Sequence, residues 1–263
     1  MIAVIRAWPT LLRVAVAEMV AYRAEMIIWV LTATLPLVML ALWNAAAAEG
    51  PLAGFGRTEF ARYFVVTLVV RQMTGAWLLW ELNHQIRSGG LSTALLRPMN
   101  PLWWNLAETF SALPWRGLVL APILGLLAAL RPDVLFWPGV STILLGTLSV
   151  ALAFAVAWLV QCLFGILAFW LDDTTAIFQV YFFIWGFLSG YIVPLPLLPT
   201  GLGESARMLP FHASLGAPVE MLMGICPDPL ATLGAQAGWV LVLGGVSSLL
   251  WKRGLIRYGA CGA

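Results

Sequence analysis

The chain has 263 residues, of which 62% are hydrophobic and 10% are charged, with 14 basic and 12 acidic side chains. A soluble domain carries charges on about 25% of its residues, so the composition excludes a soluble globular protein and indicates an integral membrane protein. The net charge of +2 is too small to indicate a nucleic-acid-binding protein. Cys162, Cys226 and Cys261 are widely spaced, so we expect neither a metal site nor a disulfide framework.

The first 25 residues alternate apolar pairs with arginine and glutamate. This pattern is typical of an amphipathic helix that lies in the plane of the membrane interface. The alternative is that these residues are the start of a long first membrane helix. No small-residue cleavage site follows a short apolar region, so we do not expect a cleaved signal peptide.

Three membrane spans are predicted in the first half of the chain. The first runs from Met26 to Ala48, which has no charged residue and is long enough to cross a hydrocarbon core of about 30 Å. The second runs from Ala61 to Leu82 and has a single charge in its interior, Arg71. The third runs from Asn105 to Leu130 and contains Glu108 and Arg116, so its charge-free part is short and its cytoplasmic end is expected in the interface or against protein.

Three further spans are predicted in the second half. No charge occurs from Leu135 to Leu171, a stretch too long for one perpendicular helix and too short for two. We therefore expect one long tilted helix, preceded by an interfacial piece at residues 136–138. A polar turn at residues 172–175 starts the fifth span, Ala176 to Val193. The sixth span runs from Ala231 to Leu250.

A proline-rich hairpin at residues 194–229 separates the last two spans. It contains two segments too short to cross a membrane, 203–208 and 213–223, which is typical of re-entrant or interfacial helices. The side chains that mark this hairpin are Pro194, Pro196, Pro199, Pro210, Phe211 and Pro218. The fold predicted from these elements is an all-α polytopic membrane protein with six transmembrane helices and both termini on one side.

The distribution of basic residues predicts the orientation. One side of this topology carries Arg6, Arg13, Arg23, Arg87, Arg97, Lys252, Arg253 and Arg257. The other side carries Arg57, Arg62, Arg131 and Arg207. By the positive-inside rule, both termini and the loop between spans two and three are cytoplasmic, and the hairpin is external.

The loop between spans two and three, Glu81 to Pro101, is polar and basic. We expect Ser92 to cap a short helix that ends before Pro98. The expected apolar face of this helix is Leu91, Leu95 and Leu96, with Arg87 and Arg97 at its ends. Exposed leucines in a loop indicate a partner surface; the alternative is a plain basic loop that only sets the topology.

The predicted elements together resemble the permease subunit of ABC-2 type (type V fold) ABC transporters, as one transmembrane domain over residues 1–263. The sharper similarity is in two sequences, IRSGGLSTALLRPMNP from Ile86 to Pro101 and WKRGLIRYGACGA at the C-terminus. They resemble an ABC-2 permease subfamily in which G-x-L-x-x-x-L-L-R-P recurs.

This resemblance implies a permease, expected to be an exporter, in the bacterial inner membrane. Two permease subunits, identical or sister chains, would work with two ABC ATPase subunits. The chain has no G-x-x-x-x-G-K-[ST] phosphate loop, so we expect ATP and magnesium to bind the ATPase, with no catalytic residue or cofactor in this chain. The resemblance further implies that the cytoplasmic loop is the coupling element that docks the ATPase. The coupling residues are then Ile86, Arg87, Leu91, Leu95, Leu96 and Arg97. The substrate is not indicated by any side chain.

Polar residues inside the spans are candidates for a transport path or for helix pairing. A charge at the centre of a span costs about 2.5 to 3.5 kcal/mol unless it faces protein or water, so Arg71 needs a partner. We expect Glu108 to pair with it, with Glu81 as the alternative. The pair would either line the path or join spans two and three. Gln161 and Gln179 are further candidates for path lining or interhelical hydrogen bonds.

Two other functions are weighed against a permease. An integral-membrane enzyme that modifies lipids would need clustered carboxylates or histidines near an interface, and the sequence offers only Asp172 and Asp173 with no neighbouring histidine motif. An ion-driven secondary carrier would show internal repeats with broken helices at matching positions. The helix-breaking residues are instead concentrated in the hairpin.

Overall fold

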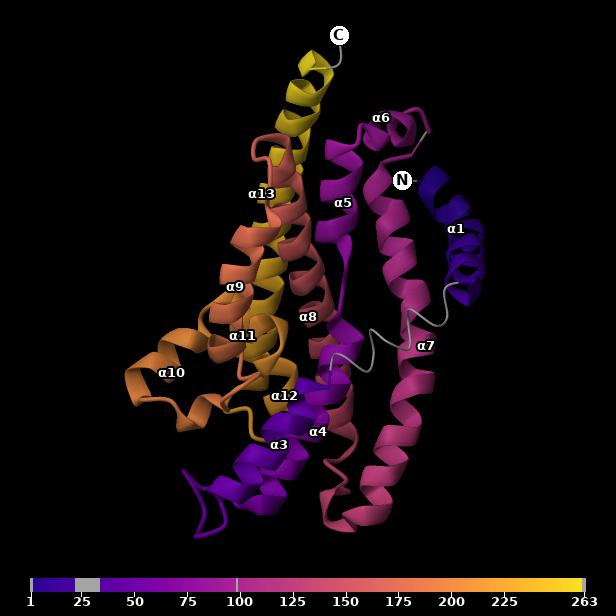
Figure 1. Ribbon diagram of the computed structural model, residues 1–263. Helices are drawn as coiled ribbons and strands as arrows, with labels where there is room; N and C mark the ends of the chain where they lie inside the picture. Colours follow the sequence, from indigo (N-terminus) through magenta and orange to yellow (C-terminus); the bar gives the residue numbers. More distant parts are fainter. Residues whose placement is uncertain (1, 22–33, 98, 262–263) are drawn as a thin grey trace.

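The computed structural model describes residues 2–21, 34–97 and 99–261 (Figure 1). These residues form helices joined by loops, with an isolated bridge between Leu52 and Phe55 as the sole β-type pairing among them. The all-α fold expected from the sequence is therefore confirmed. The predicted first span falls partly on residues 22–33, which lie outside the described residues, and its described end forms α3 (Leu35–Ala46).

Four helical segments of the described chain have the length and composition to cross a membrane: Arg57–Arg87, Pro101–Leu130, Val140–Phe169 and Pro229–Tyr258. They correspond to predicted spans two, three, four and six, and they make the chain a multi-pass membrane protein. The predicted fifth span corresponds to α9 (Thr175–Leu188), an apolar helix of 14 residues. A helix that crosses a membrane perpendicularly needs about 20 residues, so α9 alone is shorter than a full span.

The helix α8 (Val140–Ile166) lies at the centre of the molecule (Figure 1). It contacts α4 (Arg57–Thr74), α5 (Leu78–Arg87), α13 (Pro229–Cys261) and the hairpin. Small residues on α8 let its neighbours approach closely. A Cβ atom added at Gly165 would lie 3.0 Å from Leu82 of α5, and one at Gly146 would overlap Leu222. Residues 135–139, which include the expected interfacial piece, precede α8 without helical structure, and their position at the membrane interface stays a prediction.

The predicted N-terminal helix is α1 (Ile2–Ala21), which runs beside the first half of α7 (Pro101–Leu130) (Figure 1). The indole of Trp8 packs edge-on against Trp103 and Phe110, with ring centroids 6.5 and 6.1 Å apart. Aromatic packing on α7 thus fixes α1. Its position in the plane of the interface stays a prediction.

The proline-rich hairpin folds into η3 (Leu195–Leu197), α10 (Thr200–Arg207), α11 (Pro210–Ser214) and α12 (Gly216–Leu222). Pro210 begins α11, because the first turn of a helix does not use the missing N–H. The whole of 212–221 is buried against α8 and α13, including Pro218, and Pro194 is also buried. Pro196 and Pro199 are exposed, whereas Phe211 packs on Tyr181. Residues 212–221 of the hairpin therefore belong to the core.

The N-terminal end of α4 (Arg57–Thr74), at the bottom of Figure 1, is hydrogen-bonded to the loop between α7 and α8. The Arg62 guanidinium donates to the backbone oxygen of Asp133, at 2.9 and 3.2 Å, and the Thr58 hydroxyl donates to its carboxylate. The bidentate hydrogen bond from Arg131 holds the pKa of the Asp133 carboxyl well below its usual range. This polar loop marks one end of the helix bundle.

Candidate functional site

The second predicted span is broken near its middle. The helix α4 ends at Thr74, and α5 (Leu78–Arg87) begins after the non-helical residues Gly75, Ala76 and Trp77. Gly75 is a poor helix former and adopts an extended conformation with ψ 133°. Helix ends leave backbone carbonyls and amides without intrahelical partners, and such groups need other partners when they are buried in a membrane.

The carbonyls at the end of α4 are satisfied by Arg116 of α7. Its Nη1 donates hydrogen bonds to the backbone oxygens of Gln72, at 3.0 Å, and Gly75, at 2.6 Å. The Arg116 side chain is buried, with 4% exposure, and a cation is favourable at a helix C-terminus because of the helix dipole. A Cβ atom at Gly75 would lie 2.9 Å from Nη1, so glycine leaves the room that the guanidinium occupies.

The other side of the break is satisfied by Gln161 of α8. Its Nε2 donates to the Ala76 oxygen at 2.5 Å, and its Oε1 accepts from the Leu79 amide at 3.4 Å. One side chain thus bridges a carbonyl in the break and an amide in the first turn of α5. The break is therefore stabilised by hydrogen bonds from polar side chains of two neighbouring helices, α7 and α8.

Arg71 is not paired with Glu108, so that expectation is wrong. No ion pair between described residues involves Arg71 or Arg116. The Arg71 guanidinium lies over the rings of Trp185 and Phe182, with its central carbon 5.4 and 5.9 Å from the centroids. Glu108 accepts a hydrogen bond from Trp104 on its own helix, and Glu81 accepts one from Gln85 at 2.6 Å. The aromatic faces of α9 stabilise the cation, and sequence spacing cannot reveal them.

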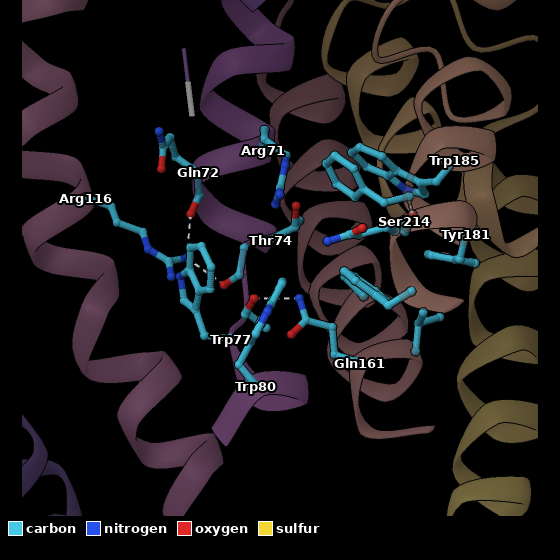
Figure 2. A pocket seen from close by; sticks show the side chains of 17 residues that line it. Arg71, Gln72, Thr74, Trp77, Trp80, Arg116, Gln161, Tyr181, Trp185 and Ser214 are labelled. Atoms are coloured by element: carbon cyan, nitrogen blue, oxygen red, sulfur yellow. Dashed lines mark hydrogen bonds between the residues drawn. The ribbon is translucent and has the colours of Figure 1, made fainter. Parts of the chain in front are cut away.

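A pocket of about 580 Å³ lies beside the break, between α4, α5, α8 and α9 (Figure 2). The residues that line it include Arg71 and Arg116, the indoles of Trp77, Trp80 and Trp185, and the amides of Gln161 and Gln179. Its lining includes no acidic side chain. The predicted polar residues Arg71, Gln161 and Gln179 thus meet around one cavity, and Glu108 is not among its lining residues. Arg116 was predicted to lie in the third span, but its place at this site was not predicted, although a charge inside the apolar helix α7 was a usable signal.

The predicted coupling residues divide into buried and exposed groups around α6 (Gly90–Leu95). Ile86 and Leu91 are buried, and Leu91 has 0% exposure in a cluster with Ile166 and Trp251. Leu95 and Leu96 are exposed, at 38% and 86%. The expectation that the three leucines share one outer face is therefore wrong. The physical reason is that α6 is a helix of only six residues, whose start packs into the bundle and whose end projects from it.

The other two coupling residues, Arg87 and Arg97, are exposed. Arg97 lies with its guanidinium carbon 5.8 Å from the centroid of the Trp104 ring. Ser92 does not cap the helix, because Gly89 occupies the N-cap position with a φ of 79° that favours glycine. The Ser92 hydroxyl instead lies 2.9 Å from the hydroxyl of Tyr258 on α13, in hydrogen-bond contact. This contact ties α6 to the end of the last helix.

A second polar cluster, also missed by sequence reasoning, lies inside the hairpin. The Glu220 carboxylate of α12 has 1% exposure and forms an ion pair with Arg207 Nη1 at 2.5 Å, and His212 Nε2 lies 3.4 Å from the same carboxylate oxygen. The signal in the sequence is a lone acidic residue in an otherwise apolar segment. The cluster joins α10, α11 and α12.

The comparison with protein families agrees with an all-α membrane fold. A model described as ABC-2 family transporter protein matches residues 15–262. The comparison with curated proteins gave no match. The family match covers nearly the whole chain, including the broken helix, α6 and the hairpin, and it confirms the resemblance carried by the loop and C-terminal sequences. The chain belongs to the ABC-2 family of transporter proteins.

Proposed function

We propose that this chain is the permease subunit of an ABC exporter, driven by ATP hydrolysis in a separate ATPase subunit that docks on α6. The observation that carries the proposal is the exposed end of α6. Leu95 and Leu96 project from the bundle between the cations Arg87 and Arg97. Exposed apolar side chains with a charged rim are typical of a protein-interaction site.

The connections of α6 support a mechanical role. Only Ser88 and Gly89 separate α6 from α5, so a displacement of α6 is passed directly to α5. Leu91 is packed in the bundle and Ser92 contacts Tyr258, so the same displacement reaches α13. At its other end α5 meets the break at residues 75–77. A helix that can pivot at such a break changes the pocket beside it when its far end is pushed.

The proposed topology has six crossings, with α3 and the residues before it as the first and α9 with the residues after it as the fifth. In Figure 1, α6, the start of α1 and the end of α13 lie at one end of the molecule, which supports a common cytoplasmic side. The basic residues near these three segments support the same orientation. The hairpin is then external, and the membrane is the bacterial inner membrane.

The proposed complex contains two permeases, identical or sister chains, and two ATPases. The chain itself acts without catalytic residues and without a cofactor of its own. ATP and magnesium bind the ATPase subunits, because the chain has no phosphate-binding loop of the Walker type. Its task is to convert movement at α6 into altered access to a path through the membrane.

The proposal is tested by co-purification of the tagged full chain with its ATPase from native membranes. An ATPase should co-elute with the wild-type chain. Leu96→Glu should reduce the co-eluting ATPase about tenfold or more, because it places a charge where apolar contact is expected. The matched control is Leu52→Glu, which changes an exposed leucine in the loop at the opposite end.

The control should leave co-elution unchanged. Reconstituted vesicles give the second measurement, in which transport should require ATP and should fall with Leu96→Glu. Transport that runs on an ion gradient without ATP would overturn the proposal. So would an ATPase that remains bound to Leu96→Glu with undiminished coupling.

A further inference from the structure

The pocket beside the helix break has an uncompensated positive charge. Arg71 and Arg116 both line it, its lining includes no carboxylate, and none of the ion pairs of the described residues reaches either guanidinium. A charge that is removed from water without a counter-ion is unfavourable. The cavity is therefore electrostatically prepared for an anion.

The two arginines have different roles in this cavity. Arg116 Nη1 is committed to the carbonyls of Gln72 and Gly75, which stabilise the helix break. The Arg71 guanidinium lies over two aromatic rings and in hydrogen-bond contact with the Tyr191 hydroxyl, and its Nε is buried without a hydrogen-bond partner. In Figure 2, Arg71 extends from α4 toward the space between Trp185 and Thr74. Arg71 is thus the group that a ligand can engage.

The remaining walls are suited to an apolar chain. Trp80 packs on Phe178 and Trp77, with ring centroids 5.5 and 5.0 Å apart, and both tryptophans keep about 40% of their surface exposed. The volume of about 580 Å³ lies within the range of about 300 to 1,000 Å³ usual for small-molecule sites. The amides of Gln161 and Gln179 add polar groups to the lining of the pocket.

We propose that this pocket binds an amphiphile with an anionic headgroup, a phosphate or a carboxylate, which pairs with Arg71 while its apolar chain lies along Trp77 and Trp80. The proposal rests on the proposed function, since it names the substrate class of the permease. A planar guanidinium offers paired donors to an oxyanion, and the pairing is strong in a site shielded from water. A cationic amphiphile is disfavoured, because it would meet two like charges.

The test is a binding measurement on the purified full chain in dodecyl maltoside, with radiolabelled dodecyl phosphate as the probe. Unlabelled dodecyl phosphate should displace the probe, and dodecylphosphocholine should compete at least about tenfold more weakly, because its choline group neutralises the headgroup charge. Arg71→Gln should weaken probe binding about tenfold or more, whereas Arg71→Lys should retain most of it.

The matched control is Arg57→Gln, the same change at an exposed position of α4 outside the pocket, which should bind as the wild type does. All variants are compared at equal monodispersity and thermal stability, so that misfolding is not read as lost binding. Competition by phosphatidylglycerol in nanodiscs would identify a membrane lipid as the ligand. Competition by free dodecyl phosphate and not by the lipid would identify a free amphiphile.

Equal competition by dodecyl phosphate and dodecylphosphocholine would overturn the proposal, as would unchanged binding in Arg71→Gln. The measurement needs no ATPase, so the two proposals fail separately. Anion binding without a co-eluting ATPase would support the pocket assignment and contradict the proposal that the chain is an ABC exporter permease. ATP-coupled transport without anion selectivity would contradict the pocket assignment and leave the exporter proposal supported.

Discussion

At the scale of single residues, the helix break depends on one glycine and one arginine that lie on different helices. Gly75 leaves the space that the Arg116 guanidinium fills, and the guanidinium replaces the hydrogen bonds that the end of α4 lacks. Neither residue signals the break alone. An isolated glycine is tolerated within a helical pattern, and a lone arginine in an apolar helix does not identify its partner.

We expect Gly75→Ala to destabilise the protein, since the new Cβ atom would lie 2.9 Å from Arg116 Nη1 and would displace it from the carbonyls. Loss of hydrogen bonds to buried groups costs about 1 to 3 kcal/mol, which thermal unfolding in detergent would detect as a lower Tm. Gly125→Ala on α7 is the matched control, because its Cβ atom would meet nothing within 4 Å. Equal Tm values for the two variants would contradict the assigned role of Gly75.

At the scale of elements, the sequence predicted which segments form helices better than which side chains they bury. Spans two, three, four and six follow from long apolar runs with few charges, because the hydrophobic core of a membrane imposes that pattern. Leu91 and Leu95 are spaced like residues of one helical face, and yet they are buried and exposed respectively. Burial at the ends of a short helix depends on its neighbours, here Ile166 and Trp251.

The hairpin shows the same limit. Its short helices were predictable from prolines, whereas the buried polar cluster of α10, α11 and α12 was not, since Arg207, His212 and Glu220 are separated along the chain. The partner of Arg71 was missed for a related reason. Ion pairing was the obvious expectation for a cation in a span, but the aromatic faces of Phe182 and Trp185 are equally available to it.

We expect Arg207→Gln to destabilise the hairpin, because it removes the guanidinium that pairs with the buried Glu220 carboxylate and leaves only His212 Nε2, 3.4 Å away, beside it among the described ionisable groups. Removal of one partner of a buried ion pair costs about 3 to 5 kcal/mol, and partial exposure of Arg207 places the loss at the lower end. Adding Glu220→Gln should recover much of the loss, since no charge is then buried. Thermal unfolding of Arg207→Gln and of the double variant measures both effects, and Glu204→Gln at an exposed position is the control. If the double variant loses as much stability as the sum of the two single variants, Arg207 and Glu220 are not coupled.

At the scale of the whole molecule, the proposed function requires that α6 and the loop around Leu52 lie on opposite sides of the membrane. The two regions are at opposite ends of the molecule in Figure 1, joined by the span Arg57–Arg87. A break in the middle of this span does not prevent it from crossing, because Arg116 and Gln161 satisfy the freed backbone groups. The orientation then follows from the basic residues near α6 and the termini.

We expect a cysteine placed at Leu52 to react with a membrane-impermeant maleimide in whole cells, and one placed at Leu96 to react only after permeabilisation. Both positions are solvent-exposed, and the variants are made with Cys162, Cys226 and Cys261 replaced, so that each reports one site. Labelling of both in detergent is the control for reactivity. Labelling of both in whole cells would mean that Arg57–Arg87 does not cross. Reversed labelling would place α6 outside the cell, where no ATPase driven by cytoplasmic ATP could dock on it.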